Sequence, residues 1–274
     1  MRAMKRLLTL VALAGLAAGC RESVEARFIY YPSPEVTEDP STVGLAFRDV
    51  EFPAADGVRL HGWLIPGRTP ITLLYSHGNG GNIAGRVGIA RMLVDRLGVG
   101  VFLYDYRGYG RSEGTPSEAG LVSDALGARA ALLREGVAAD DIVYFGRSLG
   151  AAVTVDLALA HPPRGVVLES PFASVRTMAN RVLPGAGFLF RTRWDSLTKI
   201  RNLRAPLLVL HGDADETIPV AQGLAVFAAA PEPKKFFTIR GGRHYDMEEA
   251  WSEYWAVWRA FLAGLAAPTS TAAR

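Results

Sequence analysis

Three side chains spread over the sequence have the types and the order that nucleophilic catalysis by a serine requires. Ser148 lies in the pentapeptide GRSLG, a G-x-S-x-G pattern that exposes the hydroxyl at a tight turn when a strand precedes it and a helix follows. Asp215 and His244 come later in the chain, so the order is Ser, Asp, His. The pentapeptide alone is a weak signal, because short glycine and serine patterns recur by chance. Its meaning depends on the elements that surround it.

The base that would activate the serine has to be chosen among five histidines. His61 lies in a predicted hairpin, and His161 ends the helix that follows the serine, so neither is expected near the strand ends. His77 and His211 each end a strand as His-Gly and precede better placed residues. His244 follows the last strand in the glycine turn IRGGRH, downstream of the other candidates. It is the predicted base.

The acid is expected after a strand that lies between the serine and the histidine in the chain. The segment LVLHGDADETIP offers three candidates, of which Asp215 is the first choice and Asp213 and Glu216 are the alternatives. Glu169, at the end of VVLES, competes because some hydrolases carry the acid one strand earlier. A metal site built from His211 and the aspartates is disfavoured, since no H-x-x-x-H pattern or cysteine pair supports it.

Backbone N–H groups are needed to stabilise the oxyanion that forms during acyl transfer. Leu149, the residue after the nucleophile, supplies one such group. The glycine-rich segment SHGNGGN supplies the other, through Asn79, because its glycines let the chain approach a substrate closely. A phosphate-binding loop is the alternative for this segment, but the Gly-Lys-Ser/Thr sequence that it needs is missing.

The predicted elements place these residues at strand ends. Residues 46–67 read as an antiparallel hairpin around Ala55-Asp56-Gly57, and short apolar strands then alternate with helical stretches. The strands are 71–78, 99–108, 141–146, 165–170, 205–212 and 234–241, and the helices are 82–97, 117–135, 148–160 and 246–265. Such continuous apolar strands are typical of a parallel sheet buried on both faces. The fold class is therefore α/β, a doubly wound and mostly parallel sheet whose ligands bind at the carboxyl ends of the strands.

The chain divides into a leader, a tether and one domain. Residues 1–19 combine a basic start with a short apolar run, which is typical of a lipoprotein signal peptide with the lipid on Cys20, the only cysteine. An uncleaved anchor helix or a simple cleaved signal are the alternatives. Residues 20–45 are expected to form a tether and an extended arm whose FIYYP cluster packs on the domain. A single α/β domain is expected to span 46–264, and a flexible tail 265–274.

A long segment within the domain, about 172–203, interrupts the alternation of strands and helices. Its LPGAGFLF stretch suggests a small cap over the strand ends and a pocket for an apolar acyl group. A surface connection that merely covers the sheet is an equal alternative.

The charge distribution argues against a nucleic-acid partner. The 274 residues carry a formal net charge of +3, and Arg2, Lys5 and Arg6 in the leader account for all of it. The body of the protein is therefore neutral and offers no basic patch for phosphates. We expect a small-molecule or acyl-ester substrate, no cofactor and no metal, and attachment to a membrane of the bacterial cell envelope through the N-terminal lipid. Oligomeric state is not predicted.

The motifs SHGNGGN, YDYRGYGRSEG, FGRSLGAAV, LESPFAS, HGDADETIP and GGRHYD, in this order, resemble the α/β-hydrolase superfamily. Within it they are similar to ABHD-type serine hydrolases related to protein depalmitoylases and to their bacterial relatives, which share a serine aminopeptidase-like domain. The resemblance implies Ser148, Asp215 and His244 as a catalytic triad, Asn79 and Leu149 as the oxyanion hole, and a structural role for Asp105. It implies an esterase or thioesterase. A serine aminopeptidase, and less so a non-catalytic envelope binding protein, are the alternatives.

Overall fold

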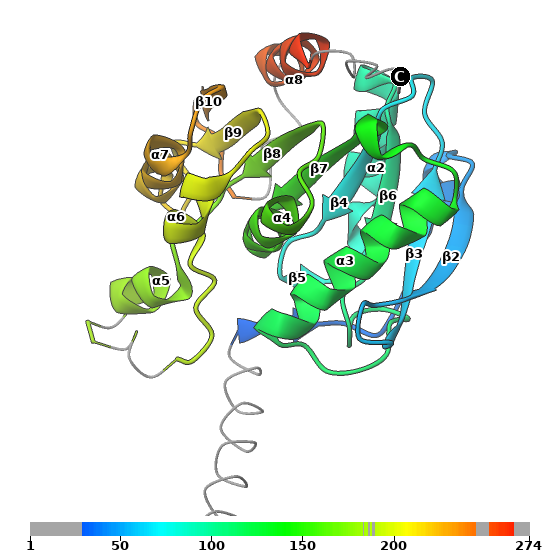
Figure 1. Ribbon diagram of the computed structural model, residues 1–274, viewed down its shortest axis with the longest axis horizontal. Coiled ribbons are helices and arrows are strands. Elements are labelled where there is room, and N and C mark those ends of the chain that lie inside the picture. Colours follow the sequence, from blue (N-terminus) through cyan, green and yellow to red (C-terminus); the bar gives the residue numbers. More distant parts are fainter. Residues whose placement is uncertain (1–28, 183, 186, 188–189, 245–251, 266–274) are drawn as a thin grey trace, which may run out of the picture.

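The computed structural model describes residues 29–182, 184–185, 187, 190–244 and 252–265 (Figure 1). The predicted signal peptide, Cys20, the first part of the tether and the tail from residue 266 lie outside these ranges, so the expectations for them stay predictions. Within the described ranges, no helix is both long enough and apolar enough to cross a bilayer.

A single large sheet of eight strands forms the centre of the molecule (Figure 1). Its spatial order is β10 (Lys234–Ile239), β9 (Leu207–Gly212), β8 (Gly165–Glu169), β7 (Ile142–Arg147), β4 (Thr72–Ser76), β6 (Gly100–Tyr104), β3 (Arg59–Ile65) and β2 (Arg48–Pro53). The pairs from β10 to β6 are parallel, whereas β3 pairs antiparallel with both β2 and β6. The predicted fold class, with its N-terminal antiparallel hairpin, is confirmed.

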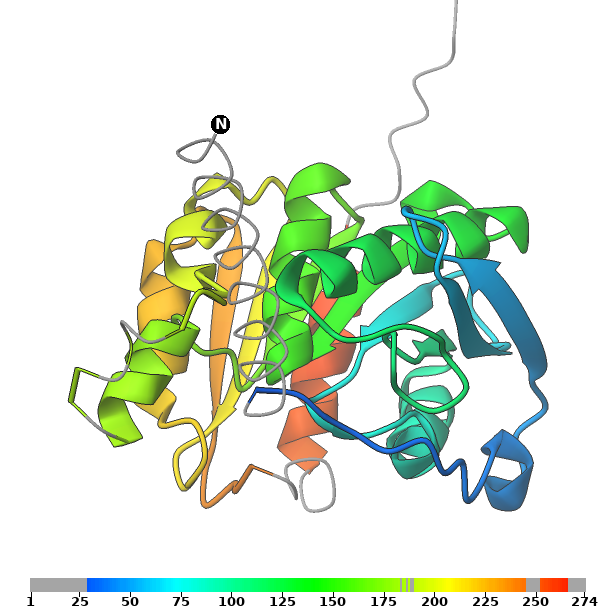
Figure 2. The same ribbon diagram turned by 90° about the horizontal axis from the view of Figure 1, so that it is seen from below.

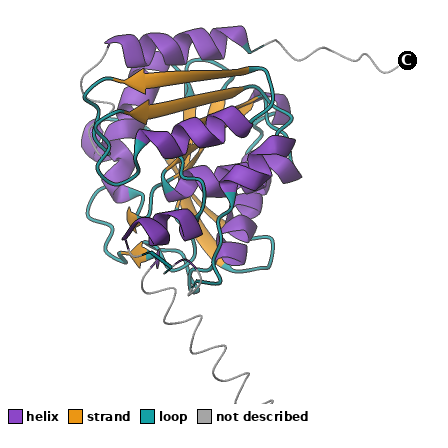
Figure 3. Ribbon diagram, turned by 90° about the vertical axis from the view of Figure 1, so that its left-hand side faces the viewer, coloured by secondary structure: helices purple, strands orange, loops and turns teal. Residues whose placement is uncertain are grey.

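Helices cover both faces of the sheet, as the continuous apolar strands require. The longer helices are α2 (Val87–Leu97), α3 (Glu118–Arg134), α4 (Leu149–Ala160), α5 (Val175–Val182), α7 (Val220–Ala229) and α8 (Ser252–Gly264). Shorter turns are α6 (Ser196–Lys199), η1 (Pro40–Val43), η2 (Ala84–Arg86), η3 (Ala139–Asp141) and η5 (Ile200–Asn202). One apolar core joins α3, α4 and α7 to the sheet, and a second joins α2 and α8 to its other face (Figure 2). Figure 3 shows strands enclosed between the two helical layers.

Local signals set several of these boundaries. The Ser117 side chain accepts a hydrogen bond from Gly120 N and so caps the start of α3. At the end of α2, Gly98 adopts a φ of 73°, the left-handed conformation that glycine tolerates best. Helix α7 was absent from the sequence prediction. Its burial is confined to a few positions such as Gly223 and Val226, and its alanine-rich sequence carries little periodicity.

The strand register brings the carboxyl ends of β7, β8 and β9 to one level. Arg147, the last residue of β7, pairs with Glu169 of β8, and Glu169 pairs in turn with Leu210 of β9. Ser148 N then donates to Glu169 O at 2.9 Å, and Ser170 N donates to Leu210 O at 2.9 Å. The loops that follow these strands therefore start side by side, which is where the ligands of a doubly wound sheet bind.

The N-terminal arm crosses this same edge of the molecule. Its short strand β1 (Tyr31–Pro32) pairs with β5 (Gly80–Gly81), which lies in the glycine-rich loop after β4. Tyr30 is buried, and its hydroxyl accepts a hydrogen bond of 3.2 Å from Trp194 Nε1 in the segment 172–203. The described part of the arm is thus packed on the domain, between the loop after β4 and this segment.

Candidate active site

Ser148 occupies a turn between β7 and α4 with a backbone conformation that few non-glycine residues adopt. Its φ is 55° and its ψ is −117°. Such a conformation costs roughly 1–3 kcal/mol and persists only where the surroundings enforce it. Here the hydrogen bond from Ser148 N to Glu169 O and the start of α4 immediately after it hold the turn. The half-buried serine therefore stands above the end of β7, as the pentapeptide predicts.

The two glycines that flank the serine are required by close backbone packing. A Cβ atom on Gly150 would lie 1.9 Å from the Ser76 carbonyl oxygen, and one on Gly146 would lie 2.3 Å from Gly150 O. Both contacts are far inside the van der Waals separation and involve backbone atoms, which cannot turn away. The G-x-S-x-G pattern thus lets α4 start directly against the end of β4, where the glycine-rich loop begins.

The carboxylate of Asp215 is built to accept hydrogen bonds. Its Oδ2 is 2.8 Å from His244 Nδ1 and accepts from Ser170 Oγ at 2.8 Å. Its Oδ1 accepts from the backbone N–H groups of Thr217 and Ile218 at 2.9 and 2.7 Å. Burial raises the pKa of Asp215, but the hydrogen bonds from His244 and Ile218 outweigh it, so the pKa lies below its usual value. Asp215 is therefore ionised at neutral pH.

His244 is buried beside Asp215 and lines the same cavity as Ser148. Because its Nδ1 carries the proton donated to Asp215, its Nε2 keeps a lone pair that can accept a proton. Arg147 fixes the backbone at this point, since its Nη2 donates to His244 O at 2.5 Å. The structure thus brings the three predicted residues to one place, with Asp215 and His244 in direct contact.

The competing acids have other partners. Glu169 is buried, forms an ion pair with Arg147 Nε at 3.1 Å and accepts from Tyr254 OH of α8 at 2.6 Å. Asp213 accepts from Gly241 N at 2.6 Å and so closes a turn. Glu216 is exposed and lies 3.4 Å from Arg243. These contacts give all three carboxylates structural roles.

The other described histidines His61, His161 and His211 have positions that fit structural roles. His61 bonds to Asp49 at 2.6 Å in the hairpin, and the exposed His161 follows α4. His211 is buried beneath Asp215, with Nε2 at 2.7 Å from Ile218 O. Burial lowers its pKa and keeps it neutral.

The glycine-rich loop after β4 lies against the nucleophile. A Cβ atom on Gly78 would be in ordinary contact with Ser148 Cβ, at 3.7 Å. The Asn79 side chain anchors the loop, because its Oδ1 accepts from Tyr31 N at 3.2 Å and from Tyr109 OH at 3.0 Å. Leu149 is the first residue of α4, so its N–H has no acceptor within that helix. The loop and the helix start therefore approach the serine together, as an oxyanion hole requires.

A buried His–Asp pair lies under this loop. Burial lowers the pKa of His77 to about 3 and raises that of Asp105 to about 7. His77 Nε2 and Asp105 Oδ1 are 3.6 Å apart, too far for a direct hydrogen bond. Asp105 Oδ1 accepts from Ile83 N at 2.9 Å, which ties the start of η2 to the end of β6. Asp105 thus has the structural surroundings that the resemblance implied.

The site opens into a cavity of about 740 Å³. Thr217 and His244 line it from the loops after β9 and β10, and Arg86 and Met92 line it from η2 and α2. Tyr31 of the arm completes the wall. Sequence reasoning missed Tyr31, Arg86 and Thr217 as lining residues. The only available signal was the FIYYP cluster, which predicted packing of the arm but not its position.

Comparison with known proteins identifies the family. A sequence model described as "Serine aminopeptidase, S33" matches residues 70–199. The chain is 33% identical over 282 residues to the alpha/beta hydrolase domain-containing protein WAV2 of Arabidopsis thaliana, which covers 92% of this chain and 91% of that protein. The chain belongs to the α/β-hydrolase superfamily. It is a hydrolase of that superfamily, in agreement with the resemblance read from the motifs.

Two further relatives of this α/β-hydrolase extend the comparison. Protein YfhR of Escherichia coli K12 is 37% identical over 235 residues, with 81% of each chain covered. The Pyrococcus furiosus esterase Pf2001 superposes with a TM-score of 0.73 at 19% identity, covering 86% of this chain and 97% of that one. The second likeness shows a shared fold.

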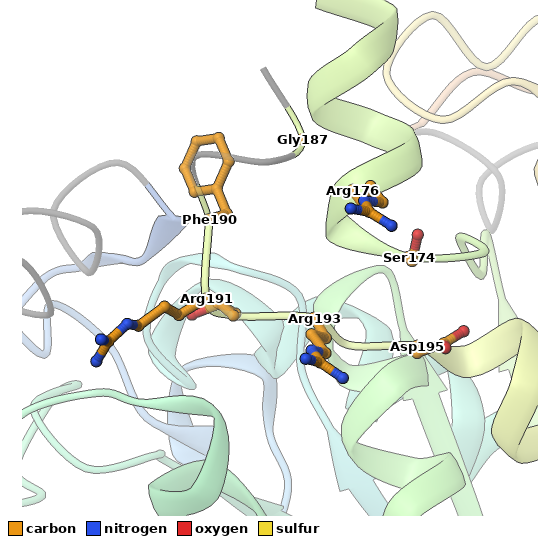
Figure 4. A pocket seen from close by; sticks show the side chains of 8 residues that line it. Ser174, Arg176, Gly187, Phe190, Arg191, Arg193 and Asp195 are labelled. Carbon is orange, nitrogen blue, oxygen red and sulfur yellow. The ribbon is translucent and has the colours of Figure 1, made fainter. Parts of the chain in front are cut away.

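A second cavity, of about 500 Å³, is lined by residues of the segment 172–203 (Figure 4). Arg176, Arg191 and Arg193 line it, and Asp195 is the single acid among its described lining residues. The Asp195 carboxylate accepts from Thr198 N at 3.1 Å and so caps α6. This cavity is cationic rather than acidic. No group of three or more histidine, cysteine, aspartate or glutamate side chains that could hold a metal ion occurs in the described part of the chain.

Proposed function

We propose that this α/β-hydrolase cleaves carboxylic ester or thioester bonds through an acyl-enzyme on Ser148. The observation that carries the proposal is the Asp215–His244 hydrogen bond, set beside a serine whose backbone is held in a strained turn and which lines the same cavity as His244. The ionised Asp215 holds the Nδ1–H tautomer of His244 and stabilises the imidazolium that forms when Nε2 takes a proton.

In the first half-reaction, Ser148 Oγ attacks the carbonyl carbon while its proton passes to His244 Nε2. The backbone N–H groups of Asn79 and Leu149 receive the developing oxyanion. Collapse of the resulting tetrahedral intermediate breaks the bond to the leaving group, which takes the proton from His244 Nε2. Water then attacks the acyl-enzyme, gives its proton to Nε2, and the acid is released as the proton returns to Ser148 Oγ.

Hydrolysis of p-nitrophenyl esters by the wild-type protein and by Ser148→Ala tests this proposal. We expect the substitution to lower kcat/KM by about 10⁴-fold or more. Ser41→Ala, at an exposed serine of η1, is the matched control and should retain the wild-type rate. Labelling by a fluorophosphonate should map to Ser148. Hydrolysis by Ser148→Ala within tenfold of wild type would refute the mechanism, and absence of labelling in folded protein would favour a binding protein.

A serine aminopeptidase is the second candidate, because the matching family model carries that description. Such an enzyme needs a carboxylate to bind the substrate's amino terminus. The described lining of the site cavity contains Arg86 and Arg147 and no acid. In the second cavity, the one described acid is Asp195, which caps α6 and lies among three arginines. These charges favour the ester hydrolase. Faster cleavage of aminoacyl amides than of the matching esters would reverse the choice.

We further propose that the protein is exported and attached to a membrane of the cell envelope through a lipid on Cys20. The basic start, the short apolar run and the cysteine after LAAG support this proposal. Mass spectrometry of protein from the membrane fraction should find a mature chain that starts at a diacylglyceryl-modified Cys20. A mature N-terminus elsewhere, or an unmodified cysteine, would contradict it.

A further inference from the structure

Glycines around the site differ in what surrounds them. Gly146 and Gly150 flank Ser148, are required by packing as described above, and are not among the residues that line the cavity. Gly85 of η2 and Gly88 of α2 line the cavity, yet a Cβ atom on either would meet no atom within 4 Å. Neither has a positive φ. Gly80, in the loop after β4, also lines the cavity and is equally open. Backbone sterics therefore do not require glycine at Gly85 and Gly88, two exposed positions that border the cavity.

Apolar side chains make up part of the cavity wall, beside Arg86, which lies between the two glycines in the chain. Ile89 and Met92 of α2 line this wall, and so does Tyr31, a residue that is 59% exposed. Tyr31 is held against the oxyanion loop by its backbone, through the β1–β5 pairing and the bond from its N–H to Asn79 Oδ1. The apolar wall is thus attached directly to the loop that receives the oxyanion.

The floor between the loop and α2 is fixed by an arginine. Arg86 Nη2 donates to Gly80 O at 2.7 Å, and its Nη1 donates to Gly85 O at 3.1 Å. These bonds join the oxyanion loop to η2 across the base of the cavity. The groove over Gly85 and Gly88 is therefore preformed and does not depend on a ligand to order it.

The order of the strands decides which part of an ester lies in this groove. The leaving group must face His244, from which it takes a proton, and His244 follows β10. Gly85, Gly88 and Met92 follow β4, which lies on the other side of β7 in the sheet. With Ser148 at the end of β7, the two substituents of the reacting carbon point to opposite sides. The groove lies on the acyl side.

We propose that Gly85, Gly88, Ile89, Met92 and Tyr31 form an acyl-chain subsite, and that the substrates are esters or thioesters of medium to long, unbranched acyl groups. The inference rests on the proposed function, because it assigns a subsite to that reaction. It places the acyl chain beside α2 and the N-terminal arm instead of in the cap, where the LPGAGFLF stretch had suggested it.

Filling the groove with Gly88→Leu tests the assignment. The measurement is kcat/KM for p-nitrophenyl esters from acetate to dodecanoate. Each buried methylene strengthens binding by about fourfold, so excluding two or three should lower the decanoate-to-acetate ratio by roughly 15- to 60-fold. Gly264→Leu, at the other described helical glycine with open space and no positive φ that lies outside the cavity, should leave the wild-type ratio. If Gly88→Leu fails to fold, Gly85→Ala with Gly88→Ala gives a smaller shift in the same direction.

The outcomes separate the subsite from the reaction. A wild-type enzyme that prefers long acyl esters, with a ratio lowered in Gly88→Leu but not in Gly264→Leu, supports the inference. An unchanged ratio in folded Gly88→Leu overturns it while leaving the ester hydrolase intact. A change confined to a series of acetate esters with lengthening alcohols would place the leaving group in the groove and also overturn it. If wild-type protein hydrolyses no ester in a Ser148-dependent manner, the proposed function itself fails.

Discussion

Replacement of Gly150 by alanine should separate the nucleophile from the oxyanion loop. In an ordinary helix this change would stabilise the protein by up to about 1 kcal/mol. Here the new Cβ atom would lie 1.9 Å from Ser76 O and 2.6 Å from His77 O. Carbon and oxygen atoms need about 3.5 Å, so either the start of α4 or the end of β4 must move by roughly 1.5 Å.

Both consequences of that movement can be measured. Overpacking of this kind costs about 1–3 kcal/mol, which corresponds to a fall in Tm of roughly 3–10 °C for a chain of this size. Ser148 directly precedes α4 and the glycine-rich loop directly follows β4, so moving α4 away from β4 separates the two and should lower kcat/KM by about 10²-fold. Gly264→Ala, at an open helical glycine, is the control: it should leave kcat/KM unchanged and should not lower the Tm.

The reasoning would be refuted by a Gly150→Ala protein whose Tm lies within about 2 °C of wild type and whose activity lies within about threefold. Thermal unfolding followed by circular dichroism and hydrolysis of a p-nitrophenyl ester suffice for the comparison. Loss of activity with an unchanged Tm would instead mean that the backbone shifts at little cost in stability, and that only the placement of Ser148 depends on the glycine.

Two further predictions concern buried charge. Burial raises the pKa of Asp105 to about 7, so the stability that its protonated form provides is complete below pH 4 and is lost as the pH rises through 7. Urea unfolding should therefore show a free energy of unfolding that falls between pH 4 and 8 in wild type and falls less in Asp105→Asn. Glu169→Gln leaves Arg147 without its buried carboxylate and should destabilise the fold by about 3 kcal/mol. An unchanged midpoint in urea would contradict this, and Glu135→Gln, at a more exposed ion pair with Arg48, is the matched control.

Local patterns were sufficient to predict the fold and to place three candidate residues at one edge of the sheet. Strands such as β7 and β9 are buried at every position, and that burial appears in the sequence as an unbroken apolar run. The positions of Ser148, Asp215 and His244 follow from the rule that side chains after parallel strands meet at one edge. Helix α7 was missed, because it is alanine-rich and only partly buried and so lacks a helical apolar period.

The walls of the site could not be predicted in the same way, because they depend on contacts between distant segments. Tyr31 reaches the cavity only because β1 pairs with β5, about fifty residues later, and a two-residue pairing leaves no mark on composition or periodicity. Gly85 and Gly88 look like any glycines near a helix start. What distinguishes them from Gly150 is the space around them in the folded protein: a side chain at Gly150 would collide with backbone atoms, and one at Gly85 or Gly88 would not. Sequence motifs thus predict which residues meet at the candidate site, whereas the proposed acyl subsite depends on the arm and the open glycines, where no motif exists.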